Sequence, residues 1–299
     1  MWTCLGVLFH TAAHVVPISS TPHYLRPLRP RGCLRCSTAQ QQEPISSILE
    51  QCKLACDSIS DLVEEVYSLI GSAGSAGAAA TAFKGDESYF TLADGLVQAL
   101  LLRLLIDRVG DVVGEEDGTE CRISAAPFTV GDMVAPAELE STILRCRDTV
   151  DELCSGMGEA VWPSITAFVD PIDGTREFCT GKGTSCSICV GLSDSDGRVV
   201  GGLVYRPLDE PRSWAMGCAA EGFVRSSLRV EGQQPEVRAG GGQRPGGGSF
   251  LMSPSGGSPF LEHVASELGL DCLRVGGAGN KALLLLEGVG ACYIQVSSE

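Results

Sequence analysis

The segment D-P-I-D-G-T at residues 170–175, directly after an apolar run at 164–169, restricts the fold of this chain more than any other segment. The run is short and apolar, which predicts a buried strand, and the Pro and Gly then force a turn. Asp170 and Asp173 therefore lie together at the end of a strand. Such carboxylates, with the Ile172 carbonyl and a further acid such as Glu115, suit the oxygen coordination of Mg²⁺.

The turn also predicts a phosphate site. If a helix begins after the turn, the backbone N–H groups of Gly174 and Thr175 point at its open end, where anions bind. Taken alone, an Asp-Pro-x-Asp sequence is explained equally well by a turn with an Asx cap. The neighbouring motifs have to decide between the two interpretations.

Histidine is too scarce for most nucleophilic catalysis. Only four histidines occur, and three of them lie before residue 43, so a Ser/His or Cys/His pair would depend on His263 alone. Any catalysis by this chain must therefore depend on carboxylates.

The 37 acidic residues against 22 basic ones give a net charge of −15, which argues against a nucleic-acid partner. No stretch reaches the roughly 18 apolar residues of a membrane span, so we expect no membrane partner.

The 14 cysteines are spread through a chain too long to need disulfides for its core, so we expect mostly buried free thiols. Two CxxC pairs occur, Cys33/Cys36 and Cys186/Cys189. The second pair falls in a run that predicts a strand, where residues three apart point to opposite faces. A zinc site would need further ligands, which are not evident.

Residues 1–42 contain several arginines and no acidic residue, a composition typical of a removable targeting segment. We expect an organellar protein, in a plastid or mitochondrion; a disordered leader on a cytoplasmic protein is the alternative. Residues 230–248 are rich in Gly, Gln and Pro, which predicts a linker or long loop. The linker divides the chain into units at 43–229 and 249–299.

Periodicity and turn residues predict the elements within these units. Thr91 and Asp94 have the spacing of a capping box, and Asp194 to Gly197 predicts a hairpin turn. Residues 117–159 are polar and hard to assign, and we treat them as an insertion with one helix near 137–153. Helices are expected at 43–70, after residue 91, at 259–268 and at 281–287, with strands at 111–113, 164–169, 186–192, 199–205, 249–252 and 291–296.

In combination, the motifs are highly specific. D-P-I-D-G-T, with G-E-E at 114–116 and T-L-A-D at 91–94 upstream, resembles the inositol monophosphatase superfamily of Mg²⁺-dependent, lithium-sensitive phosphatases. D-P-I-D-G-T-R-E-F and R-V-G-G-A-G-N-K at 274–281 are similar to its 3'(2'),5'-bisphosphate nucleotidase branch. The resemblance spans about 43–298. It implies a layered αβαβα sandwich of the inositol monophosphatase and fructose-1,6-bisphosphatase type, with an α+β first domain and an α/β second domain.

The resemblance also implies roles for individual residues, with Mg²⁺ as cofactor and a small phosphate monoester, a nucleoside bisphosphate or an inositol phosphate, as substrate. The implied metal ligands are Glu115, Asp170, the Ile172 carbonyl and Asp173. Asp94 and Thr175 would orient and activate the attacking water. The expected substrate-binding residues are Gly174, Thr175, Ser253, Gly277 and Lys281.

The sequence departs from the family pattern at two places. Residues 253–256 read S-P-S-G where nucleotidases resemble T-R-S-H, which removes an expected substrate-contacting His. A further metal-binding Asp in a W-D motif is expected after the strand at 291–296 and is not in this sequence, so we expect an incomplete second domain. The leading expectation is hydrolysis of the 3'-phosphate of adenosine 3',5'-bisphosphate. The alternatives are an inositol polyphosphate 1-phosphatase or inositol monophosphatase, and a non-catalytic remnant.

Overall fold

The computed structural model describes residues 43–72, 80–83, 89–116, 119–228, 248–254 and 258–295. The predicted leader at 1–42 lies outside these residues. Nearly all of the predicted linker at 230–248 lies outside them as well. The division into domains at these boundaries therefore stays a prediction.

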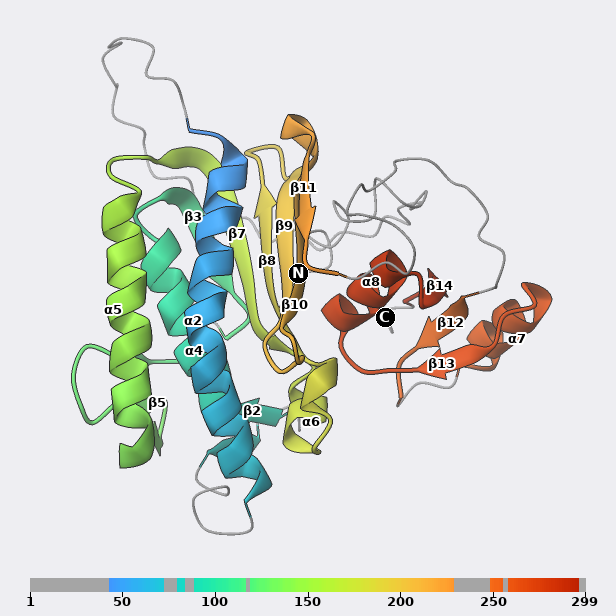
Figure 1. Cartoon of the computed structure of the whole chain (residues 1–299), viewed down its shortest axis with the longest axis horizontal. Coiled ribbons are helices and arrows are strands. Elements are labelled where there is room, and N and C mark those ends of the chain that lie inside the picture. Colours follow the sequence, from blue (N-terminus) through green and yellow to red (C-terminus); the bar gives the residue numbers. More distant parts are fainter. Residues whose placement is uncertain are drawn as a thin grey trace.

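A mixed six-stranded sheet forms the centre of the molecule (Figure 1). Strands β3 and β7 are parallel, and the other neighbours pair antiparallel. The predicted hairpin is confirmed as β8 and β9, joined by a turn with Gly197 at φ 76°. In order across the sheet the strands are β11 (Phe223–Ser226), β10 (Ser213–Cys218), β9 (Val199–Arg206), β8 (Ser187–Ser193), β7 (Trp162–Asp173) and β3 (Val109–Gly114).

Helices α2 (Ile45–Gly71) and α4 (Leu92–Leu105) cover one face of this sheet, and α5 (Glu140–Gly156) packs against both of them. All three were predicted: α2 and α4 from their apolar stripes, α4 also from its capping box, and α5 as the one helix expected within the polar segment at 117–159. The segment treated as an insertion is part of the core, because Val130, Ile143 and Cys146 are fully buried in the main hydrophobic cluster. This segment also forms a small antiparallel sheet of β4 (Cys121–Arg122), β5 (Thr129–Val130) and β6 (Met133–Val134).

Helix α8 (Ala278–Glu287) packs on the opposite face of the large sheet, where Leu283 contacts Val204 and Ala215. A parallel sheet follows, in the order β13 (Cys272–Arg274), β12 (Ser249–Met252), β14 (Gly290–Tyr293). Helix α7 (Pro259–Glu267) covers its outer face through Leu261 and Ala265. The layers therefore alternate α, β, α, β, α, and the predicted layered sandwich is confirmed (Figure 1).

Six short elements complete the described chain. Strands β1 (Thr81–Phe83) and β2 (Tyr89–Thr91) pair before α4, and the 3₁₀ turn η1 (Ala137–Leu139) leads into α5. Helix α6 (Thr175–Cys179) and the 3₁₀ turn η2 (Gly183–Ser185) connect β7 to β8. A third 3₁₀ turn, η3 (Ala219–Glu221), lies between β10 and β11.

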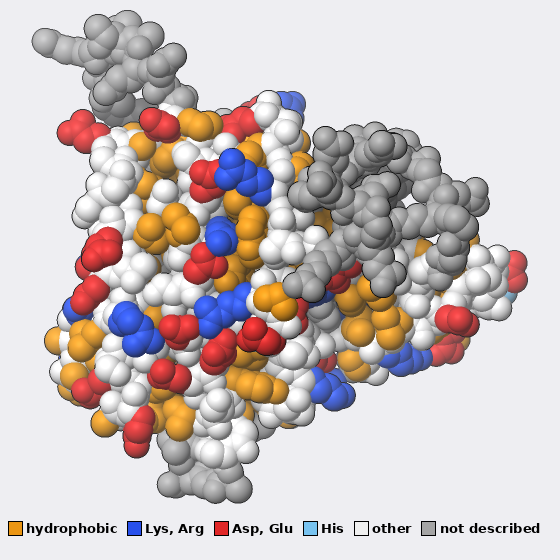
Figure 2. Space-filling model, in the orientation of Figure 1, with side chains coloured by type: hydrophobic (Ala, Val, Ile, Leu, Met, Phe, Trp, Pro, Cys, Tyr) orange, Lys and Arg blue, Asp and Glu red, His pale blue; other side chains and the backbone are white. Residues whose placement is uncertain are grey.

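Acidic and basic side chains are interspersed on the face shown in Figure 2. Arg212 forms ion pairs with Asp61 and Glu64 of α2, at 2.8 Å each. None of the helices in the described ranges is both long and apolar enough to cross a bilayer.

The cysteines of the described ranges are all free. About half of them are buried, and the others are partly buried or exposed.

Candidate active site

The N-terminus of α4 fixes the side chain of Asp94. Thr91 is the N-cap, and the predicted capping box is confirmed: the Thr91 backbone N–H and hydroxyl both donate to Asp94 Oδ2, at 2.9 and 2.6 Å. Asp94 is fully buried, and this burial raises its pKa to about 7 despite the hydrogen bonds from Thr91. A carboxyl group with this pKa exchanges protons readily near neutral pH.

The end of β7 carries the motif at residues 170–175. The strand does not stop at Asp170, as the Asp-Pro sequence predicts, but continues to Asp173 with a register shift against β8 between these two residues. This irregularity accommodates the proline, which cannot donate to the sheet. Gly174 then adopts φ +93° and α6 begins at Thr175, so the predicted turn and helix are confirmed.

Asp170 is a buried carboxyl group in an unfavourable electrostatic environment. It is 5% exposed, and among the described residues its Oδ1 has no hydrogen-bond partner. Burial raises the pKa of this carboxyl well above its usual range, and the negative charges of Asp173 and Glu115 raise it further. A buried carboxylate without a partner is unfavourable. The position therefore calls for a proton or a cation.

Thr175 connects the part of the site on α4 with the part on β7. Its hydroxyl lies 3.2 Å from Asp94 Oδ1 on α4 and 3.0 Å from the Ile172 carbonyl on β7. The three predicted positions, 94, 172 and 175, are therefore brought together although 81 residues separate the first from the last.

Asp173 is held by the N-terminus of α8 and by Ser187 of β8. Its carboxylate accepts hydrogen bonds from the backbone N–H groups of Ala278 and Gly279, at 3.0 and 2.7 Å, and from the Ser187 hydroxyl at 3.0 Å. The N-terminus of the ten-residue helix α8 thus points at a carboxylate, which the helix dipole favours. Gly277, at φ +68°, leaves no room for a side chain, because a Cβ would lie 2.3 Å from the Ser185 carbonyl.

Glu115 lies on the turn after β3, and its backbone N–H donates to the Val169 carbonyl at 2.9 Å. Its side chain is exposed, whereas that of Glu116 is buried. Within the described part of the chain, no group of three or more His, Cys, Asp or Glu side chains is arranged to hold a metal ion. The charges of Glu115 and Asp173 act on Asp170, but these three carboxylates are not arranged as a set of ligands around one point.

Family membership follows from a comparison over almost the whole described chain. The model of the inositol monophosphatase family matches residues 46–299. The chain belongs to this family. A mouse protein named 3'(2'),5'-bisphosphate nucleotidase 1 is 24% identical over 69% of this chain, which spans 63% of that protein's length. A Dictyostelium discoideum protein of the same name is 26% identical over 81% of this chain and 74% of its own length.

Among solved structures, a staphylococcal inositol monophosphatase complexed with products aligns with 86% of this chain and 77% of its own, at a TM-score of 0.47 and 13% identity.

Of the residues predicted to bind substrate, Lys281 and Ser253 lie together in this family member, with Lys281 Nζ 3.4 Å from Ser253 Oγ. Lys281 is 2% exposed and its Nζ lies 5.0 Å from the centre of the Tyr293 ring. Burial lowers the pKa of this lysine, although the charge of Asp173 opposes the effect. Contact of either residue with a substrate stays a prediction.

Sequence reasoning missed Ser187 as part of the site. Its side chain is fully buried and donates to Asp173. A polar residue in an otherwise apolar strand was the available signal, because buried hydroxyls need partners. Cys186 Sγ donates to the Gly174 carbonyl at 3.1 Å, so this cysteine supports the turn rather than a zinc ion.

Proposed function

We propose that this chain is a divalent-cation-dependent phosphatase that hydrolyses the 3'-phosphate of adenosine 3',5'-bisphosphate. Family membership supports phosphate-ester hydrolysis, and the names of the similar mouse and Dictyostelium proteins support the nucleotide substrate. The observation that carries the proposal is Asp170, a buried carboxyl with an unpartnered oxygen beside two further carboxyl groups.

The donor chemistry of the site fits a hard cation. Glu115, Asp170, the Ile172 carbonyl and Asp173 offer only oxygen, which Mg²⁺ prefers over sulfur or nitrogen. A bound divalent cation would polarise the phosphoryl group and lower the pKa of a neighbouring water. It would also neutralise the charges that now raise the pKa of Asp170.

The chain's own residues provide a route for the proton of the attacking water. Thr175 is positioned by the Ile172 carbonyl and by Asp94, which is itself fixed by two hydrogen bonds from Thr91. The Thr175 hydroxyl can accept a proton from water as it passes its own to Asp94. A pKa of about 7 suits Asp94 to this role, because a base is most effective when its pKa is near the working pH.

The substrate's nucleoside would extend from this site toward the second unit of the chain. The loop at 276–278 packs against Ser185 and Asp173, and Lys281 reaches from α8 toward Ser253 after β12. These contacts support Gly277, Lys281 and Ser253 as residues near the nucleoside, and Gly174 with Thr175 as residues near the phosphate.

Phosphate release by the purified chain tests the proposal, with adenosine 3',5'-bisphosphate, inositol 1,4-bisphosphate and inositol 1-phosphate assayed side by side over a Mg²⁺ titration. We expect the nucleotide to be hydrolysed with the highest kcat/KM and no release in EDTA. Thr175→Val should lower kcat by roughly 100-fold or more, because it removes the proton route. Thr180→Val, on the exposed end of α6, is the matched control. Faster release from either inositol phosphate would contradict the nucleotide assignment.

A further inference from the structure

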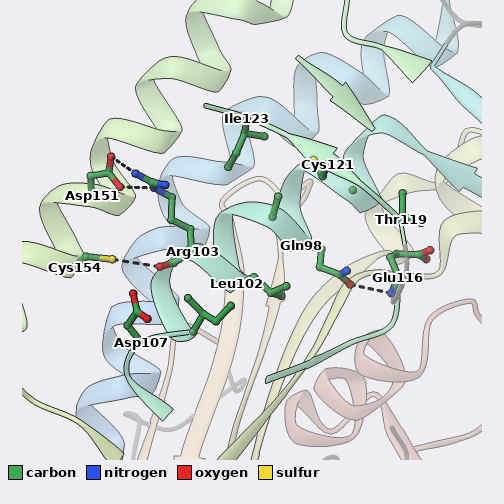
Figure 3. A pocket seen from close by; sticks show the side chains of 13 residues that line it. Gln98, Leu102, Arg103, Asp107, Glu116, Thr119, Cys121, Ile123, Asp151 and Cys154 are labelled. Atoms are coloured by element: carbon green, nitrogen blue, oxygen red, sulfur yellow. Dashed lines mark hydrogen bonds and ion pairs between the residues drawn. The ribbon is translucent and has the colours of Figure 1, made fainter. Parts of the chain in front are cut away.

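A cavity of about 570 Å³ lies beside α4, outside the set of candidate active-site residues. Neither Asp94, Thr175 nor Asp170 lines it. Its floor is one stripe of α4 and the residue that follows this helix, at helical spacing: Gly95, Gln98, Ala99, Leu102, Arg103 and Ile106. β4 and α5 supply the opposite walls (Figure 3). The volume is within the range of roughly 300–1,000 Å³ that small-molecule sites occupy.

Much of the lining is apolar. Leu102, Ile106 and Ile123 contribute branched aliphatic side chains, and Ala99 and Cys121 add smaller ones. Leu102 lies in the middle of the view in Figure 3, between the charged groups. This wall favours a ligand with an apolar body, since burying it removes apolar surface from water.

The charges of the cavity are unbalanced. Among the described residues that line it, Arg103 is the only basic one, and its guanidinium is already paired with both oxygens of Asp151, at 2.5 and 2.9 Å. Asp107 adds a further negative charge to the lining; Glu116, which also lines the cavity, is buried and has partners of its own. The chain as a whole carries a net charge of −15. The cavity therefore attracts a cation and repels an anion, including the phosphate esters of the candidate active site.

The cavity shares a wall with the turn that carries Glu115. Gln98 Oε1 accepts a hydrogen bond from the Glu116 backbone N–H at 2.9 Å. The same side chain packs on Gly114, where a Cβ would lie 2.4 Å from the Gln98 amide. A ligand that moves Gln98 therefore moves the turn at residues 114–116.

We propose that this cavity binds an organic ammonium ion with an apolar body, and that its occupancy shifts the Glu115 turn through the Gln98–Glu116 hydrogen bond. The binding itself does not depend on the proposed function. Its effect on catalysis would follow from that function, because Glu115 is a predicted metal ligand.

Three isosteres of different charge test the binding: 3-phenylpropylamine, 3-phenylpropan-1-ol and 3-phenylpropionate, titrated into the full chain at pH 7 and followed by calorimetry. We expect the amine to bind roughly tenfold more tightly than the alcohol, and the carboxylate most weakly. Ala99→Leu fills the floor with a good helix former, and Asp107→Asn removes an exposed charge; both should weaken amine binding. Asp148→Asn, an exposed acid of α5 outside the lining, should not.

Backbone amide shifts test the coupling without any need for activity. The Glu116 amide should move during the amine titration in the wild-type chain, and this movement should be lost in Gln98→Met. Equal affinities for amine and alcohol, no binding up to 10 mM, or binding unaffected by Ala99→Leu would each overturn the proposal. If the shifts occur and no phosphate ester is hydrolysed, the proposed function fails and the cavity assignment stands.

Discussion

Asp170 carries an electrostatic cost that a neutral side chain would relieve. It is buried among like charges, and its Oδ1 lacks a partner within the described residues. We therefore expect Asp170→Asn to leave the cation-free fold as stable as wild type, or more stable by about 1 kcal/mol. Phosphate release should fall beyond the roughly 10–100-fold that loss of an outer-shell partner causes. Urea unfolding in EDTA and a Mg²⁺-dependent assay measure the two effects. Retained turnover at unchanged Mg²⁺ dependence would refute the ligand assignment.

Asp94 should make the cation-free protein less stable as the pH rises toward neutrality. Burial raises its folded-state pKa from 3.8 to about 7, so the folded chain holds a proton that the unfolded chain has released between these values. Because the folded state binds more protons, the free energy of unfolding decreases across this window, by up to roughly 1.4 kcal/mol per pH unit. Asp94→Asn should reduce this slope. Urea unfolding in EDTA at pH 4.5, 5.5 and 6.5 compares the two chains, and equal slopes would contradict the prediction.

At the scale of single elements, α2 depends on a cap from a distant part of the chain. Pro44 provides no side-chain cap, and the carboxylate of Glu221, in η3, instead accepts hydrogen bonds from the backbone N–H groups of Ile45 and Ser46, at 2.5 and 3.0 Å. Glu221→Ala should lower the free energy of unfolding by about 1 kcal/mol, as loss of an N-cap does. Urea unfolding measures the change, with the exposed Glu120→Ala as control. An equal effect of both substitutions would show that this cap contributes nothing specific.

Elements with a strong local signal could be predicted from the sequence, and others could not. The stripe of α2 and the capping box of α4 are local patterns, so both helices were placed correctly. Strands β10, β11 and β13 were missed, because they are short and pair with partners that no local pattern reveals. Helix α8 begins at Ala278 rather than Lys281, since Gly277 and the contact of its N-terminus with Asp173 fix the start, 105 residues away in sequence.

At the scale of the whole molecule, Arg206 of β9 links the large sheet to α8 through an ion pair and hydrogen bonds. It is 4% exposed, pairs with both oxygens of Glu287 at 2.8 and 3.2 Å, and donates to the Asn280 carbonyl. Arg206→Met should destabilise the chain by about 3 kcal/mol, because Glu287 loses its partner. Adding Glu287→Met should restore most of the loss. A double-mutant cycle in urea measures this, with Arg198→Met, an exposed arginine, as control. Additive effects of the two substitutions would rule out the coupling.

The cap on α2 also has a consequence for the order of folding during synthesis. The residue that completes this helix follows its first turn by about 175 positions, so it leaves the ribosome long after the helix itself. The helix can dock against β9 and β10 only once those late strands exist, because they form the surface beneath it. Until then only α4 and α5, which are made earlier, can cover part of its apolar stripe. A chaperone that binds amphipathic segments would therefore find the part of α2 that faces β9 and β10 accessible until those strands and η3 have been made.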